Sequence, residues 1–319
     1  MKVSIIIPAF NNAALTKKCL EAIKKNTPEK HLDDVIVVDN ASTDHTAKYL
    51  KSLGWIKVIS NKKNLGFSRA NNQGAREAKG DVLIFLNNDT EVRKGWLEPL
   101  LRVLSEKETA IAAPKLIFPN GRVQHAGIVI SNDYIPRHIY YNESPDEPFV
   151  NKKREFQAVT AACMAIKKNV FEKAGGFSDE YLNGMEDIDL CLKAGKLGYK
   201  VFYCPESIVV HHESVSAGRF KAVNHNEEIF LQKWKDKIMP DEEKHYREDG
   251  FGWFYIKKKN LKNKYLISSG RAAGKPFGFK VMRFFYLTLH RITLGTKLVL
   301  TLDFKTLSTK IRKVRDAKG

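Results

Sequence analysis

A run of five apolar residues, Val82–Leu86, ends abruptly in the polar residues Asn87, Asn88 and Asp89. A short apolar run bounded by polar turns is typical of a strand that is buried on both faces, as in the parallel sheet of an α/β protein. In such sheets, ligands bind just beyond the carboxyl ends of the strands. An acidic group at that place, here Asp89, is suited to holding a divalent cation, although an ordinary turn between a strand and a helix has the same composition.

The same pattern occurs in the residues before this run. Residues 2–7 are a short β-rich run that Pro8 ends, and residues 35–38 are an apolar run that closes on Asp39 and Asn40. Residues 56–59 predict another strand. Helical spacing separates these runs over residues 13–25, 42–53 and 68–78, and a further helix is expected over 95–104. This alternation predicts an α/β fold with a mostly parallel open sheet and helices on both faces. Right-handed crossovers place the carboxyl ends of the parallel strands at the same edge of the sheet. We therefore expect the loop of residues 8–12 to meet Asp39 and Asp89 at that edge.

The pattern changes after residue 110. Strands are expected over 111–118 and 123–130, around a turn at 119–121, and over 156–166, 201–204 and 208–210. The long polar segment 132–154 predicts a surface loop of the kind that serves as a lid or acceptor site. The last strand precedes His211 and His212, and a histidine at a strand end is a candidate metal ligand, although a single histidine is more often structural.

Three acidic residues crowd the expected first turn of another helix: Glu186, Asp187 and Asp189. The positive end of the helix dipole favours carboxylates there, which is a purely structural explanation. The functional alternative is a general base that takes a proton from an acceptor hydroxyl.

Positive charge is concentrated in the C-terminal part of the chain. The net charge of the chain is +18. Residues 251–319 contain 17 lysines and arginines and two acidic residues, which is a net charge of +15, so the first 250 residues carry a net charge of only +3. Residues 280–300 form a basic amphipathic pattern, which predicts either a helix on an anionic membrane surface or a helical subdomain or homodimer contact. Nucleic acid binding is not expected, because no nucleic-acid motif accompanies the charge.

Several other classes of protein are disfavoured. The four cysteines lie far apart and form no C-x-x-C pair, which predicts reduced thiols in the cytoplasm, not a disulfide frame or a zinc site. No apolar run is long enough to span a bilayer, and no secretory signal is visible. The first strand is followed by Pro-Ala-Phe-Asn-Asn, without the glycines of a dinucleotide-binding turn, and no nucleophile-elbow motif occurs.

Six sequence blocks occur in an order that matches a known family: SIIIPAFNN, VVDNASTD, NLGFSRANNQG, FLNNDT, GGFSDEYLNGMEDIDLCLKAGKLGY and VVHHESVS. Together they resemble family 2 glycosyltransferases of the GT-A fold, closest to the bacterial branch that contains rhamnosyl- and other surface-polysaccharide transferases. The resemblance covers about residues 2–217 and divides the chain into a catalytic domain over 1–218 and a basic helical region over 219–319. Within the catalytic domain, 1–109 would be the nucleotide-binding half and 110–218 the acceptor half.

The resemblance implies a role for particular residues. Asn88 and Asp89 stand at the family's metal-binding D-x-D motif, where Asn87 replaces the first acid. His211 matches the later metal-binding histidine, with His212 as the alternative. Asp187 matches the catalytic base, with Glu186 as the alternative. The donor would be bound by Asn88 and by residues from the first three blocks: Pro8, Ala9, Phe10, Asn12, Asp39, Asn64, Gly66, Ala70 and Asn71.

The predicted function is therefore an inverting glycosyltransferase that depends on Mg²⁺ or Mn²⁺. It would move a sugar from a UDP- or dTDP-sugar donor to a glycan or lipid-linked acceptor, in the cytoplasm or peripherally on the inner face of the cell membrane. Two alternatives to a glycosyltransferase are also compatible with the sequence: a nucleotidyltransferase acting on a sugar phosphate, and a catalytically silent module that binds nucleotide-sugar or glycan.

Overall fold

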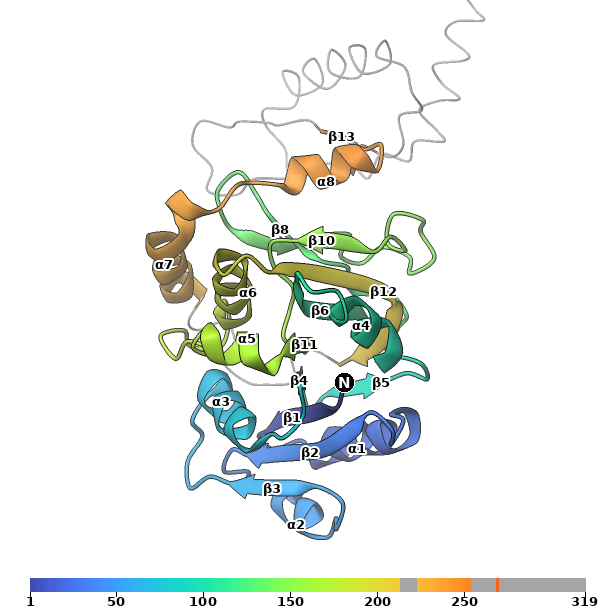
Figure 1. Ribbon diagram of the computed structural model, residues 1–319, viewed down its shortest axis with the longest axis vertical. Coiled ribbons are helices and arrows are strands. Elements are labelled where there is room, and N and C mark those ends of the chain that lie inside the picture. Colours follow the sequence, from blue (N-terminus) through green and yellow to red (C-terminus); the bar gives the residue numbers. More distant parts are fainter. Residues whose placement is uncertain (213–222, 254–267, 270–319) are drawn as a thin grey trace, which may run out of the picture. The chain divides into compact units, whose positions relative to one another are not determined.

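The structure is a computed structural model that describes residues 1–212, 223–253 and 268–269 (Figure 1). The chain divides into two compact units, Met1–Glu242 and Glu243–Gly319. The first unit contains every residue for which the sequence predicts a catalytic or donor-binding role.

The first unit is built on a ten-stranded sheet with the order β10-β12-β6-β11-β4-β1-β2-β3, in which β5 also pairs with β12 and β7 with β6. Six of these strands (β3, β2, β1, β4, β6 and β12) run in the same direction, with β11 inserted antiparallel between β4 and β6. The predicted mostly parallel sheet is therefore confirmed. The strands are β1 (Val3–Ala9), β2 (Leu32–Asp39), β3 (Lys57–Ser60), β4 (Val82–Leu86), β5 (Thr90–Val92), β6 (Thr109–Ile117), β7 (Val123–His125), β10 (Arg154–Phe156), β11 (Cys163–Lys167) and β12 (Lys200–His211). A separate pair is formed by β8 (Ile128–Ile130) and β9 (Pro136–His138).

Helices cover both faces of this sheet, as expected (Figure 1). On one face, α1 (Ala13–Asn26), α2 (Thr46–Lys51) and α4 (Leu97–Leu104) contribute to a core that includes Leu20, Leu50 and Trp96. On the other face, α6 (Glu186–Lys196) and α7 (Val223–Trp234) contribute Leu190 and Phe230 to a second core. The helices α3 (Phe67–Glu77) and α5 (Lys168–Lys173) lie on the side of α6 and α7. Strands buried on both faces explain why Val82–Leu86 reads as a continuous apolar run.

The structure corrects some predicted boundaries. The expected strand 156–166 is two strands, β10 and β11, and the intervening residues form a loop. The two strands expected over 201–210 are one, β12, whose pairing with β6 shifts register between Cys204 and Ile208. The first compact unit, Met1–Glu242, includes α7, which buries Phe230 and Trp234 in the core beside α6. The predicted division of the chain at residue 218 stays a prediction.

The second unit contributes few described residues. These include α8 (Glu242–Glu248), which begins at the last residue of the first unit, and the short pair β13 (Gly252–Trp253) and β14 (Ser268–Ser269). The basic amphipathic segment 280–300 lies outside the described residues. Among the residues that the structure does describe, no helix is both long and apolar enough to cross a bilayer.

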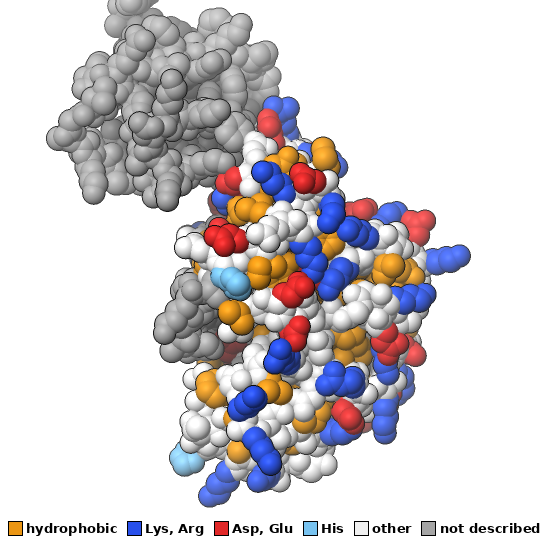
Figure 2. Space-filling view, turned by 90° about the vertical axis from the view of Figure 1, so that its left-hand side faces the viewer, with side chains coloured by type: hydrophobic (Ala, Val, Ile, Leu, Met, Phe, Trp, Pro, Cys, Tyr) orange, Lys and Arg blue, Asp and Glu red, His pale blue; other side chains and the backbone are white. Residues whose placement is uncertain are grey.

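On one face of the protein, the charged side chains are mixed in sign (Figure 2). Figure 2 shows lysine and arginine side chains interspersed with acidic side chains over the visible face, not gathered in one patch. The net charge of only +3 for the first 250 residues agrees with this distribution. All four cysteines are buried free thiols.

Candidate active site

A cavity of about 550 Å³ opens where β1 and β4 end. This volume suits a ligand the size of a nucleotide or a small drug. Its walls come from both halves of the first unit, so residues separated by about 200 positions in the chain share one space. The lining residues include Pro8, Ala9, Phe10, Asn11, Asn12, Asn40, Asn64, Gly66, Phe67, Asn87, Asn88, Asp89, Gln124, His138, Thr160, Ala161, Asn183, Gly184, Glu186, Asp187 and His211.

The loop after β1 forms one wall of the cavity. Asn11 and Asn12 both adopt the left-handed conformation, with φ of 58° and 60°, which asparagine tolerates better than most residues. The backbone N–H of Asn11 donates to the Ser42 hydroxyl at 2.9 Å, and the N–H of Thr43 donates to Asn11 Oδ1 at 2.7 Å. These bonds fix the loop, and they leave Phe10 42% exposed, with its side chain able to stack on a flat ring.

An asparagine network fixes the second loop on this side. Asn40 donates from Nδ2 to Asn64 Oδ1 at 2.7 Å, and its Oδ1 accepts the N–H of Leu65 at 2.9 Å. Asn61 and Gln73 extend the network through their side-chain amides. Asn40 therefore positions Asn64 and Gly66 at the cavity. The sequence had predicted a donor-binding role for its neighbour Asp39 instead.

Three predicted donor-binding residues do not line the cavity. Asp39 is 4% exposed, and its Oδ1 accepts the backbone N–H of Ser42 at 3.0 Å, so it stabilises the turn after β2. Ala70 and Asn71 are fully buried on the inner side of α3, and Asn71 Nδ2 donates to the Phe67 carbonyl. They lie one turn into the helix, whereas the cavity meets only the start of the helix at Gly66 and Phe67.

The pairing of β5 with the end of β12 brings Asp89 and His211 together. His211 lies opposite Thr90 in the ladder, and its Nε2 is 3.1 Å from Asp89 Oδ1. Both side chains are nearly buried and both line the cavity. Burial alone would raise the pKa of Asp89, but the hydrogen bond and charge of His211, with a smaller contribution from His212, lower it below its usual value.

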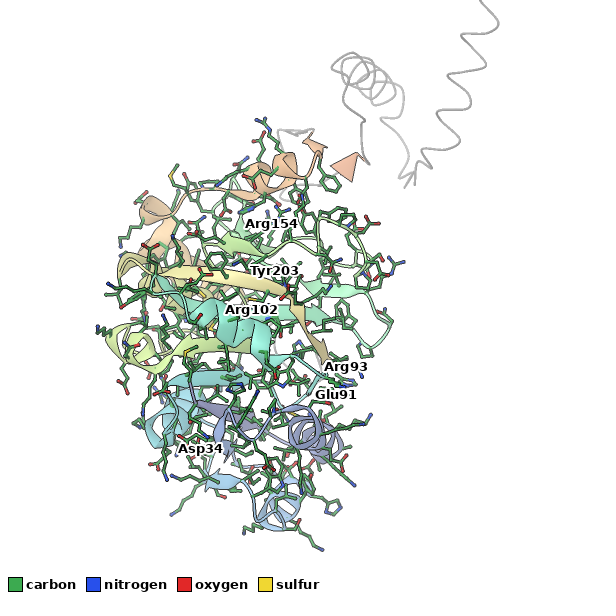
Figure 3. All side chains as sticks on the ribbon, turned by 45° about the vertical axis from the view of Figure 1, so that its right-hand side comes forward. Asp34, Glu91, Arg93, Arg102, Arg154 and Tyr203 are labelled. Carbon is green, nitrogen blue, oxygen red and sulfur yellow. The ribbon has the colours of Figure 1, made fainter. Side chains whose placement is uncertain are left out.

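The other histidine is directed elsewhere. His212 Nε2 lies 2.7 Å from Glu91 Oε1, and it is not among the residues that line the cavity. Glu91 projects from β5, where Figure 3 labels it. Of the two candidate histidines, the structure therefore brings His211 to Asp89 and pairs His212 with Glu91.

The chemistry of the Asp89–His211 pair fits a divalent cation. His211 Nδ1 lies 2.7 Å from Gln124 Oε1, and since that oxygen only accepts, Nδ1 carries the proton. His211 Nε2 faces the Asp89 carboxylate at 3.1 Å and also lies 3.4 Å from Asn87 Nδ2, so Asp89 and His211 together present an oxygen and a nitrogen ligand to one place in the cavity. A second hydrogen bond that orients a histidine in this way is usual at metal sites. Within the described ranges, no group of three or more His, Cys, Asp or Glu side chains is placed to hold a metal. In general, Mg²⁺ is often held by only one or two carboxylates together with substrate phosphates.

A second carboxylate reaches the cavity from the first turn of α6. Asp187 accepts the backbone N–H of Ala161 at 3.0 Å and its Oδ1 accepts the N–H of Ile188 at 2.9 Å. Burial raises its pKa, and these hydrogen bonds, with one from the Thr160 hydroxyl, offset the effect only in part. A carboxyl group whose pKa is raised by its site is better matched to accepting a proton near neutral pH.

The two neighbouring acids have different surroundings. Glu186 also lines the cavity, but its Oε2 accepts the N–H of Gly184 at 2.6 Å. Asp189 is fully buried on the side of α7, where its carboxylate contacts Lys193 at 2.8 Å, Lys233 at 2.9 Å and Trp234 Nε1 at 2.8 Å. Asp189 is therefore structural, and Asp187 and Glu186 are the two acids of this helix turn that line the cavity.

The fold and the cavity define the class of the protein. A mostly parallel sheet with a polar cavity at its strand ends, and acidic and histidine side chains converging there from β4, β12 and α6, is the arrangement of a GT-A glycosyltransferase domain.

Comparisons with known proteins give the family. Residues 4–175 match the Glycosyl transferase family 2, and the chain belongs to this family. It is 31% identical over 225 residues to the O-antigen biosynthesis protein RfbC of Myxococcus xanthus, covering 67% of this chain and 18% of that protein. It is 32% identical over 229 residues to the protein y4gI of Sinorhizobium fredii (strain NBRC 101917 / NGR234), covering 68% of this chain and 25% of the relative. The chain thus spans a quarter or less of the length of these two relatives.

A solved structure shares the fold. The crystal structure of GalNAc-T7 with UDP, GalNAc and Mn²⁺ superimposes with a TM-score of 0.59 at 20% identity, over 78% of this chain and 54% of the other. The predicted GT-A fold and the predicted family are both confirmed.

Proposed function

We propose that this chain transfers a sugar from a nucleoside-diphosphate sugar to an acceptor hydroxyl, with inversion and with the help of Mg²⁺ or Mn²⁺. The observation that carries the proposal is that the Asp89–His211 pair and the Asp187 carboxylate line one cavity, together with the loops at residues 8–12 and 64–67. A cation site and a base are the two elements that such a transfer needs.

The donor would lie against the loops of the nucleotide-binding half. Phe10 is exposed at the cavity and offers a face for the base, and the asparagine network around Asn40 holds Asn64 and Gly66 in place for the nucleoside and diphosphate. Uridine and thymidine diphosphates are the proposed carriers. GalNAc-T7, which shares the fold, was solved with UDP, and this supports a uridine donor.

Asp89 and His211 would hold the divalent cation, and Gln124 would keep the lone pair of His211 Nε2 directed at it. Bound there, the cation supplies electrostatic stabilisation to the diphosphate leaving group. Asn88 is held by hydrogen bonds to Thr16 Oγ1 and the Asn11 carbonyl, which ties this strand end to the donor loop.

Asp187 would take the proton of the acceptor hydroxyl as that oxygen attacks. The N–H groups of Ala161 and Ile188 fix the orientation of its carboxylate. A single base that acts in one displacement step inverts the configuration of the sugar. A positioned base contributes about 10²- to 10⁴-fold to the rate.

The acceptor is proposed to be a glycan or lipid-linked hydroxyl in cell-surface polysaccharide synthesis, at the cytoplasmic face of a membrane. The similarity to the O-antigen biosynthesis protein RfbC supports this assignment. The basic region 251–319, with its charge of +15, would supply the attraction to an anionic surface.

A donor panel tests the proposal. UDP-, dTDP- and GDP-sugars are incubated with the protein, Mg²⁺ or Mn²⁺ and a polysaccharide or lipid-linked acceptor, and the released nucleotide is identified. We expect a nucleoside diphosphate from one donor class. Formation of nucleotide-sugar and pyrophosphate from a nucleoside triphosphate and a sugar phosphate would instead indicate a nucleotidyltransferase. Donor binding without any release would indicate a silent binding module.

A further inference from the structure

The helix α7 lies beyond the residues that match the family, yet one of its side chains reaches the loop before the base. Asn226 is 3% exposed, and its side-chain amide makes two hydrogen bonds to the backbone of a single residue, Leu182. Its Oδ1 accepts the Leu182 N–H at 3.0 Å, and its Nδ2 donates to the Leu182 carbonyl at 3.2 Å. This two-bond contact resembles one step of a β-ladder, and it fixes both the position and the orientation of that peptide.

The loop held in this way has an unfavourable backbone. Asn183, Gly184 and Met185 follow Leu182 directly, and all three have positive φ values, of 58°, 137° and 75°. A positive φ costs free energy for a residue with a side chain, and such conformations persist only where the surroundings impose them. Met185 is the residue just before α6, so the loop sets where the helix begins and thus where Asp187 lies.

The same loop forms part of the cavity wall. Asn183 and Gly184 line the cavity beside Glu186 and Asp187. A Cβ atom at Gly184 would lie 3.5 Å from Asn226 Nδ2, so the side-chain amide of Asn226 packs directly against this loop. A change in this loop would therefore move both the wall and the helix start.

The other end of α7 is fixed independently. Trp234 Nε1 donates to the buried Asp189 of α6 at 2.8 Å, and Lys233 contacts the same carboxylate at 2.9 Å. The helix is thus anchored to α6 at Asp189, two residues after Asp187, and Asn226 extends from this anchored helix to the loop. Removing Asn226 would release the loop while the helix keeps its anchor.

We infer that Asn226 is a positioning residue for the transfer reaction: it holds the strained loop 182–185 so that Asp187 meets the acceptor hydroxyl. The inference rests on the proposed function, because it takes Asp187 as the base. The donor loops at 8–12 and 64–67 make none of these contacts, so donor binding should not depend on Asn226.

The test compares Asn226→Ala and the isosteric Asn226→Asp with a matched control, Trp234→Phe, which loses a hydrogen bond of the same helix but does not touch the loop. Both Asn226 variants should lower kcat by about 10- to 100-fold, the size of effect that a small misplacement of a catalytic group produces. Their Kd for the nucleoside diphosphate should stay within about twofold of wild type. Trp234→Phe should lower the melting temperature and leave kcat near wild type. Asn226→Asp retains the acceptor for the Leu182 N–H, but it replaces the donor to the Leu182 carbonyl by a second acceptor oxygen, so the two-bond contact is lost in this variant too.

A measurement without substrate separates this inference from the proposed function. Hydrogen exchange of the Leu182 amide should be faster in Asn226→Ala than in Trp234→Phe, because only the former removes its acceptor. Wild-type kcat in Asn226→Ala, or equal losses of kcat in Asn226→Ala and Trp234→Phe, would overturn the inference. If the wild type itself transfers no sugar, the proposed function fails and the catalytic role of Asn226 with it. If the exchange rate of the Leu182 amide is the same in Asn226→Ala as in the wild type, the hydrogen bond from the Leu182 N–H to Asn226 does not exist.

Discussion

The substitution Asp187→Asn separates catalysis from folding and from donor binding. The amide retains one oxygen, so it can still accept one of the N–H groups of Ala161 and Ile188, but it turns an NH₂ group toward the other. Leaving one buried donor unpaired costs about 1–3 kcal/mol. Because burial raises the pKa of Asp187, its charge is itself unfavourable in this site, and removing the charge offsets part of that cost. We therefore expect a net loss of stability within about 2 kcal/mol.

The effect on turnover should be much larger. Loss of a general base lowers kcat by about 10²- to 10⁴-fold, equivalent to about 3–5 kcal/mol in the barrier. The assay measures sugar transfer and released nucleoside diphosphate, together with donor binding by calorimetry and the melting temperature. Wild-type transfer by Asp187→Asn, with the protein folded and donor bound, would refute the assignment of the base.

The pH dependence of the same pair of proteins gives a second readout. The base acts in its ionised form, and its pKa is raised by burial. Wild-type kcat should therefore fall as the pH drops through the pKa of Asp187, which lies above the ordinary range of an aspartate. The residual kcat of Asp187→Asn should show no such decrease at low pH.

Two further substitutions test the surroundings of the site. Gln124→Leu removes the acceptor that fixes the His211 Nδ1 proton. It should weaken the apparent affinity for Mn²⁺ by about 10- to 100-fold, measured from the Mn²⁺ concentration that activates sugar transfer. An unchanged activation curve would contradict the orienting role of Gln124. Asp189→Asn removes the buried charge between Lys193 and Lys233, and it should destabilise the protein by about 2–4 kcal/mol near neutral pH. Because these partners outweigh burial and lower the Asp189 pKa, its stabilisation is present above the unfolded-state pKa of about 3.9 and lost in acid, so the difference in melting temperature should shrink there. A difference that is constant with pH would contradict this.

The sequence was sufficient to predict which segments meet, because parallel strands joined by helices must end at one edge of the sheet. Asp89, His211 and the loop after β1 meet at the cavity for this reason, and the apolar runs alone predicted the strands that carry them. The direction of a side chain at a strand or helix end is set by its local contacts. For that reason the sequence did not show that Asp39 caps its own turn, or that Ala70 and Asn71 face the core.

The contacts that the sequence did not predict join residues far apart in the chain. Gln124 meets His211 across 87 residues, and Asn226 meets Leu182 across 44. Neither residue carries a recognisable motif, since a glutamine in a strand or an asparagine in a helix most often faces solvent. These amides gain their roles because β7 pairs with the end of β6, which also pairs with the end of β12, and because α7 packs beside α6.

The most direct test of the whole account is the binding of UDP, and of dTDP in turn, measured by calorimetry with Mn²⁺ and with a chelator, for the wild type and for His211→Ala. If Asp89 and His211 hold a cation on the diphosphate, Mn²⁺ should strengthen nucleotide binding by the wild type by about tenfold or more, and His211→Ala should lose most of that gain. Equal binding with and without Mn²⁺ in the wild type, or a full gain in His211→Ala, would contradict the account.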